Sequence, residues 1–284
     1  MGTGATVHAM ELTPDSIRLD GRRALVTGAA QGIGKATALA LARFGAEVAV
    51  CDKLAEPLAE TVAEIGSLGG VARPAVLDVR DRDAVVDWVG SLSREWDDLH
   101  VLVNNAGGGF HAEFESVSAG GQAALIAENF TQVADVTRTC LPLLRAGASV
   151  SGGASVVNIT SVEAHRAGPG FGIYSAMKAG VANLTKTLAL ELSESRIRVN
   201  AVAPDMIPTP GDSGLADDSG AMTAKGWDMM PWPETGHVDD VAGAVIWLAG
   251  PMSRFVTGST VHVDGGTLAA SGWKRSVDAG TWVL

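Results

Sequence analysis

The chain of 284 residues is 46% hydrophobic and 19% charged, which is enough apolar sequence to bury a large core and excludes a disordered, collagen-like or small disulfide-rich protein. Its 21 basic and 32 acidic residues give a net charge of −11, and the sequence contains no run of Lys and Arg. An acidic surface repels phosphate groups, so neither nucleic acid nor an anionic membrane surface is expected as a partner.

In chain order, short apolar runs alternate with longer segments in which apolar residues recur every three to four positions. The predicted strands are nearly all apolar and cover Arg23–Thr27, Glu47–Cys51, Ala72–Leu77, Leu99–Asn104, Ser155–Thr160, Ile197–Ala203 and Ser259–Val263. The predicted helices cover Ile33–Phe44, Leu54–Leu68, Arg82–Trp96, Gln122–Leu144, Ser175–Ser193 and Val238–Leu248. This alternation predicts an α/β protein with a single-domain Rossmann fold, a doubly wound seven-stranded parallel sheet with helices on both faces.

Three segments flank or interrupt this pattern. We expect residues 1–17 to be a flexible leader and residues 18–284 to form the domain. An insertion at residues 206–236 is rich in Pro, Gly and Asp, yet it also contains Trp227, Met229, Met230, Pro231 and Trp232. The tail, residues 267–284, is unusually apolar for a terminus and contains Trp273, Trp282 and Val283.

Targeting and metal-binding signals are not found. The longest nearly apolar stretch, Val241 to Met252, is too short to cross a bilayer, and the first 20 residues do not resemble a signal peptide. We therefore expect a cytoplasmic protein. Cys51 and Cys140 are far apart, without a CxxC pattern or clustered histidines, so we expect two buried thiols and no metal site.

A glycine-rich turn follows the first predicted strand. Gly28-Ala29-Ala30-Gln31-Gly32-Ile33-Gly34 leads directly into a helix, whose N-terminus would face the pyrophosphate of a dinucleotide. A tight turn without a ligand is the alternative. Asp52 ends the second predicted strand, about twenty residues after the glycines, where a carboxylate binds ribose hydroxyls and repels a 2′-phosphate. The sequence therefore favours NAD over NADP, although Lys53 is adjacent and is expected to point to solvent.

Polar and small residues also end the third and fourth predicted strands. Asp78-Val79 follows the third, and Asn104-Asn105-Ala106-Gly107 ends the fourth. Because the carboxyl ends of parallel strands meet at one edge of the sheet, these residues are expected along a dinucleotide. Simple Asx turns are the alternative.

Tyr174 is the only tyrosine in the chain, and Lys178 follows it by one helical turn. A phenol with a pKa near 10 is a poor proton donor or acceptor at neutral pH, but a neighbouring ammonium stabilises the phenolate. The pair therefore suits alcohol or carbonyl chemistry. The alternative is a surface Tyr–Lys pair on an amphipathic helix. Ser161 lies thirteen residues before Tyr174, at the end of the fifth predicted strand, where its hydroxyl could hold a substrate oxygen.

Taken together, these motifs resemble those of the short-chain dehydrogenases/reductases, over essentially all of Leu19 to Gly266. The family's Thr-Gly-x-x-x-Gly-x-Gly matches Thr27 to Gly34, and its Asn-Asn-Ala-Gly matches Asn104 to Gly107. Its catalytic Asn, Ser, Tyr and Lys match Asn129, Ser161, Tyr174 and Lys178. The family's Asn-x-x-x-Pro-Gly-x-Ile-x-Thr matches Asn200 to Thr209, except that Asp205 replaces the usual Gly.

The resemblance implies that Tyr174 exchanges a proton with the substrate oxygen while the nicotinamide exchanges a hydride with the same carbon. Lys178 would lower the Tyr174 pKa and hold the nicotinamide ribose, Ser161 would polarise the carbonyl, and Asn129 would hold a water that links Lys178 to solvent. The residues implied to bind the cofactor are Gly28, Gln31, Gly32, Ile33, Gly34, Asp52, Asp78, Val79, Asn105, Ala106, Gly107, Tyr174, Lys178, Pro204, Ile207 and Thr209.

The substrate is less constrained by the sequence. The apolar insertion suggests a bulky hydrophobic alcohol or ketone, such as a steroid, terpenoid or lipid-derived compound, although the same loop could pack on another subunit. Reduction of 3-oxoacyl groups on an acyl carrier protein is one alternative, and a non-catalytic dinucleotide sensor is another. The resemblance also implies a homotetramer, and the apolar tail could reach a partner subunit. His165 and Glu163 could line the pocket, although lone loop residues commonly do not.

Overall fold

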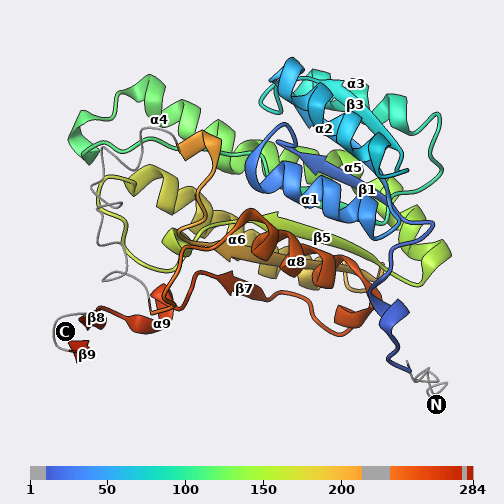
Figure 1. Ribbon diagram of the computed structural model, residues 1–284. Helices are drawn as coiled ribbons and strands as arrows, with labels where there is room; N and C mark the ends of the chain where they lie inside the picture. Colours follow the sequence, from blue (N-terminus) through green and yellow to red (C-terminus); the bar gives the residue numbers. More distant parts are fainter. Residues whose placement is uncertain (1–10, 213–230, 277–279, 284) are drawn as a thin grey trace, which may run out of the picture.

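The computed structural model describes residues 11–212, 231–276 and 280–283 (Figure 1). Its main sheet has seven parallel strands, as the sequence predicts, and the structure shows their order to be β3-β2-β1-β4-β5-β6-β7. These strands are β1 (Arg23–Thr27), β2 (Glu47–Asp52), β3 (Ala72–Val76), β4 (Val101–Asn104), β5 (Ala154–Ile159), β6 (Ile197–Pro204) and β7 (Thr260–Val263). The strand order reverses between β1 and β4, which is where α/β sheets bind ligands.

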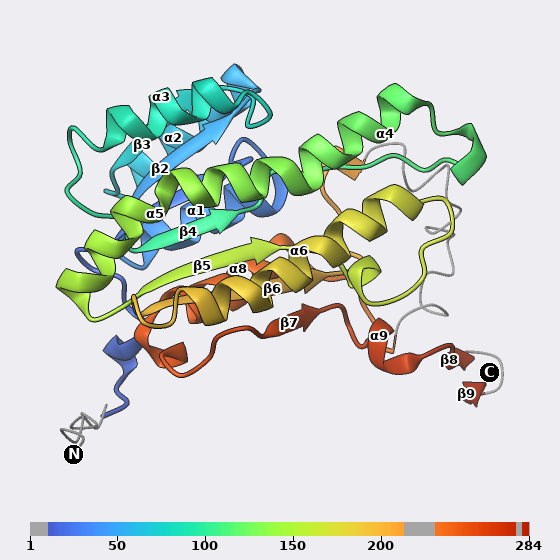
Figure 2. The same cartoon turned by 180° about the vertical axis from the view of Figure 1, so that it is seen from behind.

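Helices cover both faces of the sheet (Figures 1 and 2). One apolar core lies between the sheet and α1 (Gly32–Arg43), α2 (Ala55–Ser67) and α8 (Val238–Ala249). The other core lies beneath α3 (Arg82–Leu92), α5 (Gln132–Ser151) and α6 (Gly172–Glu191). Successive residues of β1 alternate between the cores, since Ala24 and Val26 belong to the first and Leu25 to the second. Both faces of the strands are thus buried, which explains their nearly continuous apolar sequence.

The fourth predicted helix, Gln122–Leu144, is longer and less regular than its apolar periodicity indicates. It begins as α4 (Ala119–Ile126), widens into a π-helical turn, η3 (Ala127–Thr131), and continues as α5. Asn129 lies within the widened turn and is fully buried. A π turn inside an α-helix rotates the following residues and is frequent at functional sites.

A chain of buried side-chain hydrogen bonds links the centre of the sheet to two helices. Asn104 of β4 donates to Thr137 of α5 at 2.9 Å and to Asn158 of β5 at 2.8 Å. Asn158 in turn donates to Thr185 of α6 at 2.9 Å. We call these four residues the Asn104–Thr185 chain. It fixes α5 and α6 on the same pair of strands, and therefore relates Asn129 to the Tyr174 segment.

Both ends of the described chain contain more regular structure than the sequence predicts. The last four residues of the predicted leader form a 3-10 turn, η1 (Pro14–Ile17), and Leu19 is fully buried. The tail forms α9 (Thr267–Ala270) and an antiparallel hairpin of β8 (Lys274–Ser276) and β9 (Thr281–Val283), which extends away from the sheet (Figure 1). Trp273 and Trp282 on this tail are about half exposed.

The described helices include none that combines the length and the apolar character needed to span a membrane. Cys51 and Cys140 are fully buried free thiols, as predicted. Burial raises the pKa of both, that of Cys140 to about 12.

Candidate active site

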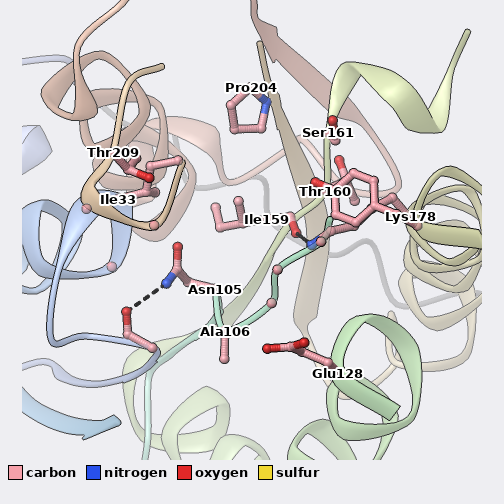
Figure 3. A pocket seen from close by; sticks show the side chains of 18 of the residues that line it. Ile33, Asn105, Ala106, Glu128, Ile159, Thr160, Ser161, Lys178, Pro204 and Thr209 are labelled. Atoms are coloured by element: carbon pink, nitrogen blue, oxygen red, sulfur yellow. Dashed lines mark hydrogen bonds between the residues drawn. The ribbon is translucent and has the colours of Figure 1, made fainter. Parts of the chain in front are cut away.

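A groove of about 820 Å³ runs along the carboxyl ends of the strands, a size that suits a cofactor or a drug-sized ligand. It brings together every residue that the sequence assigns to the cofactor, together with Ser161. Asn129 does not line the groove directly. Segments that are up to about 180 residues apart in sequence therefore converge on one site, as Figure 3 shows for part of the lining.

The glycines at the start of α1 form a backbone cradle. Gly28 and Gly32 have φ values of +68° and +56°, which disfavour other residues. A Cβ on Gly28 would lie 2.9 Å from Ala106 Cα, and one on Gly34 would collide with the Gly28 carbonyl. No side chain caps the N-terminus of α1, so its first amides face the groove. This arrangement fits the pyrophosphate of a dinucleotide.

Asp52 lies at the end of β2, at the edge of the groove. Its carboxylate accepts hydrogen bonds from the backbone amides of Ala30 at 3.0 Å and Leu54 at 3.1 Å, which hold it beside the glycine turn. Lys53 is exposed, as expected, and it also lines the groove.

Asp78 is oriented by Arg80, a residue that the sequence analysis did not select. The Arg80 guanidinium donates to both Asp78 oxygens, at 2.5–3.0 Å, and holds the pKa of this carboxyl below its usual range. Arg80 and Val79 line the same part of the groove.

Asn105 joins β4 to the glycine turn. Its side chain donates to the carbonyls of Thr27 and Gly28, both at 3.0 Å, and Thr27 Oγ1 accepts from the amides of Asn105 and Ala106 (Figure 3). Asn105 therefore shapes the cradle through its amide group, and Ala106 and Gly107 leave backbone along the groove.

Tyr174, Lys178 and Ser161 line the opposite part of the groove. The Lys178 ammonium lies 5.6 Å from the centre of the Tyr174 ring and donates to the Ile159 carbonyl at 3.1 Å (Figure 3). Lys178 is fully buried, and burial lowers its pKa to about 8, against the opposing charge of Glu128. Ser161 Oγ accepts the amide of Glu163 at 3.1 Å, which fixes the hydroxyl at the groove.

Asn129 lies behind the groove, in the π turn. Its side chain bonds to Gly108 in both directions, donating to the carbonyl at 2.7 Å and accepting the amide at 3.3 Å, and donates to Leu125 at 3.0 Å. A Cβ on Gly107 would lie 3.0 Å from Asn129 Oδ1 and 3.1 Å from Lys178 Nζ. The structure thus brings Asn129 and Lys178 to the same side of Gly107, into the space that a larger residue's Cβ would take.

The loop after β6 contains the departure at Asp205. The strained conformation falls on the next residue, Met206, with φ of +52°, and not on Asp205. Asp205 Oδ1 accepts the Met206 amide at 3.0 Å, while Oδ2 accepts the Thr267 hydroxyl at 2.6 Å. Ile207 and Thr209 follow at the groove, and Thr209 lies beside Gly32. The aspartate therefore stabilises the loop by its side chain.

Several lining residues have no signal in the sequence pattern. Glu128, Arg166, Phe171 and Met206 all line the groove. Phe171 packs edge-to-face on Tyr174, with ring centres 6.2 Å apart, and on His111 at 5.3 Å. Of the apolar insertion, Pro231 and Trp232 pack on the Gly265–Gly266 turn, whereas Trp227, Met229 and Met230 lie outside the described residues.

Proteins of known name are similar in sequence to this chain over nearly the whole domain. The chain is 38% identical to the 3-oxoacyl-[acyl-carrier-protein] reductase FabG of Thermotoga maritima, over 88% of this chain and 99% of that protein. It is 35% identical to gluconate 5-dehydrogenase of Gluconobacter oxydans, over 89% and 97% of the two chains.

Solved structures show the same fold. Carveol dehydrogenase from Mycobacterium avium in complex with NAD has a TM-score of 0.80 and 30% identity, covering 89% of this chain and 99% of that one. Other similar structures contain NADP. The model of a family described as enoyl-(acyl carrier protein) reductase matches residues 28–267. The chain therefore belongs to this family, within the short-chain dehydrogenases/reductases, and is an oxidoreductase with a nicotinamide dinucleotide site.

Proposed function

We propose that this protein is an NAD(H)-dependent oxidoreductase that interconverts a secondary alcohol and a ketone, with Tyr174, Lys178, Ser161 and Asn129 as its catalytic group. The observation that carries the proposal is the buried Lys178 beside the Tyr174 ring, at the same groove as Ser161 and the glycine cradle. A bound nicotinamide would supply the hydride donor or acceptor.

The residues of the chain account for the proton. Tyr174 exchanges it with the substrate oxygen, and the Lys178 ammonium favours the phenolate that this exchange requires. Ser161 donates to the same substrate oxygen, because its oxygen accepts the Glu163 amide and its hydroxyl hydrogen can point to the substrate. Asn129, held by Gly108, orients the path from Lys178 towards solvent.

The preference for NAD rests on Asp52. Its carboxylate is held at the end of β2 by two backbone amides, in the position where an acidic side chain binds both ribose hydroxyls. A 2′-phosphate placed there would lose hydrogen bonds and meet like charge. The pair of Lys53 and Arg80 nearby is partly offset by Asp78, to which Arg80 is bonded.

For the substrate, we propose a bulky, largely apolar alcohol or ketone. Phe171 lines the groove next to Tyr174, and Phe110 and Phe114 expose 41% and 73% of their surface on the neighbouring loop. Exposed aromatic side chains close in sequence to a groove favour an apolar ligand. That carveol dehydrogenase shares the fold is consistent with this class.

Reduction of a 3-oxoacyl carrier protein is the second candidate, because FabG of Thermotoga maritima is a close relative in sequence. An acidic carrier would meet a protein of net charge −11, which is unfavourable for its docking. We also propose that the protein is cytoplasmic and assembles as a homotetramer, from the family resemblance.

The test is oxidation of a panel of secondary alcohols, from aliphatic to steroidal, with NAD and with NADP. We expect turnover with NAD. Tyr174→Phe should lower kcat at least about 100-fold while still binding NADH, because phenylalanine keeps the aromatic ring but lacks the hydroxyl that exchanges the proton. Asp52→Ser should reduce the ratio of kcat/KM with NAD to kcat/KM with NADP by about tenfold or more. Turnover of acetoacetyl carrier protein with NADPH, but of no alcohol with NAD, would favour the second candidate. Tight NADH binding without turnover of either would favour a sensor.

A further inference from the structure

A cluster of charged side chains on the groove has no part in the proton and hydride steps. The guanidinium of Arg166 donates to Glu163 Oε1 at 2.8 Å and to Asp205 Oδ2 at 3.0 Å, and all three residues line the groove. We call these residues the Arg166 cluster. Its two carboxylates are largely buried, with 18% and 14% of their side chains exposed, whereas Arg166 exposes 36%.

The Arg166 cluster lies at the substrate side of the groove. Glu163 follows Ser161 by two residues in the turn η4 (Val162–Ala164), and its amide is bonded to the Ser161 hydroxyl. Asp205 directly follows Pro204 at the end of β6, next to β5, the strand that leads to Ser161. Asp52, which marks the adenosine side, lies on the other half of the sheet, on β2.

The guanidinium of Arg166 is held between the two carboxylates, with Nε and Nη2 donating to Glu163 and Nη2 also donating to Asp205. Burial lowers its pKa, but the hydrogen bond with Glu163 and the charge of Asp205 outweigh this, so the pKa is raised and Arg166 stays charged. One positive charge between two negative charges leaves the cluster with a net charge of −1. Glu163 Oε2 is buried and has no hydrogen-bond partner among the described residues, so part of this charge is uncompensated.

Other cationic groups on this side do not offset that charge. Lys178 donates to the Ile159 carbonyl, and His165 packs against His262 with ring centres 4.8 Å apart. Burial and the neighbouring His262 lower the pKa of His165, which favours its neutral form at pH 7. A ligand carboxylate near Ser161 would therefore meet two carboxylates, and both arginines that line the described part of the groove, Arg80 and Arg166, are already paired with carboxylates of the protein.

We infer that the Arg166 cluster makes the groove select against substrates that carry a carboxylate within a few carbons of the reacting carbon, and that Asp205 determines this selectivity. The inference rests on the proposed function, in that it concerns the substrate of the same site. It separates this chain from gluconate 5-dehydrogenase, a relative whose named substrate is a carboxylate.

Asp205 determines the selectivity because it is the second partner of Arg166. With a glycine at this position, as the family motif has it, Arg166 would pair with Glu163 alone and the cluster would be neutral. The remaining guanidinium N–H groups could then bind a ligand carboxylate, which Arg recognises well. In this chain the aspartate accepts from Arg166 Nη2 and adds a negative charge that repels a ligand carboxylate. It also bonds to Met206 and Thr267.

The test compares methyl 4-hydroxycyclohexanecarboxylate with its free acid, two probes that differ in one charge. We expect the wild-type protein with NAD to have a kcat/KM for the ester at least about tenfold above that for the acid. Asp205→Asn keeps the size, and its Oδ1 can still accept the Met206 amide while its NH2 group donates to the Thr267 hydroxyl. It removes one charge and can no longer accept from Arg166 at this position. We expect it to reduce the ester-to-acid ratio by about tenfold, mainly through KM for the acid.

Two further variants isolate the cause. Asp135→Asn removes the same charge from an ion pair with Arg138 on α5, which does not line the groove, and should leave the ratio unchanged. Arg166→Gln in the Asp205→Asn background should remove the gain for the acid, because the released guanidinium is its source. An Asp205→Asn ratio equal to that of the wild type would overturn the inference.

A binding measurement keeps this result independent of turnover. Benzamide and benzoate differ in one charge, and their binding to the NADH complex can be followed by nicotinamide fluorescence. We expect benzamide to bind more tightly to the wild type and the difference to shrink in Asp205→Asn. If this binding pattern is found but no alcohol is turned over, the result contradicts the proposed function and still supports the inference. Equal affinities for the two probes, or no binding of either, would overturn the inference.

Discussion

At the scale of single residues, Lys178 is expected to cost the protein stability. Its ammonium is fully buried, with one hydrogen bond to a carbonyl, and burial lowers its pKa from 10.5 to about 8. Because the unfolded state holds the proton more tightly, this charge opposes folding fully below pH 8, and the penalty is lost as the pH rises to about 10.5. We predict that Lys178→Met raises the Tm of the cofactor-free protein at pH 7 and abolishes turnover.

Thermal unfolding followed by circular dichroism measures this effect. The difference in Tm between Lys178→Met and the wild type should shrink between pH 8 and pH 10, where the wild-type lysine becomes neutral in the folded state. Lys186→Met on the same helix, whose lysine lies outside the groove, is the control and should show little change. A lower Tm in Lys178→Met at pH 7 would contradict the prediction.

At the scale of elements, the Asn104–Thr185 chain joins two strands to two helices. Asn158→Ala removes its centre and leaves buried donors and acceptors on Asn104 and Thr185 without their partner. We predict a loss of roughly 1–3 kcal/mol in the free energy of unfolding, measured in urea. Ser93→Ala, which removes an exposed hydroxyl at the end of α3, should change it by less than about 0.5 kcal/mol; equal effects would refute the special role of the chain.

The elements also show what the sequence could predict. All seven strands were predicted within one or two residues, since strands buried on both faces are apolar runs with clear ends. The π turn at Asn129 was not predicted, because the apolar spacing of α4 and α5 is nearly the same with or without one widened turn. The groove-lining residues with recognisable motifs were predicted, and Arg166 was not, because its bond to Asp205 spans 39 residues of sequence.

At the scale of the whole molecule, the tail has two parts, α9 and the hairpin β8–β9, whose roles can be distinguished by truncating the chain. Thr267 of α9 is bonded to Asp205, whereas the hairpin β8–β9 has two half-exposed tryptophans beside it and extends from the body (Figure 2). An isolated two-stranded hairpin is only marginally stable, so a partner subunit is expected to cover it.

We predict that a chain ending at Ser271 forms a smaller assembly than the full chain, and therefore has a smaller sedimentation coefficient, but retains the groove. A chain ending at Gly266 should in addition show a KM for the alcohol raised about threefold or more, because Asp205 loses the Thr267 hydroxyl. Sedimentation velocity and steady-state kinetics measure the two effects. Truncated chains that behave like the full chain in both would exclude a role for the tail.

The two buried thiols described above can report how often the sheet opens. Cys51 lies in β2 directly before Asp52, and Cys140 lies in α5, in the same apolar core on the same face of the sheet. Neither is accessible to an alkylating reagent while the strands stay paired, and their raised pKa values keep both in the unreactive protonated form. Each alkylation event therefore marks a molecule whose sheet has separated, and the labelling rate counts these openings without any added probe. Because the cradle amide of Ala29 is bonded to the Cys51 carbonyl, a dinucleotide seated there would slow the labelling of Cys51.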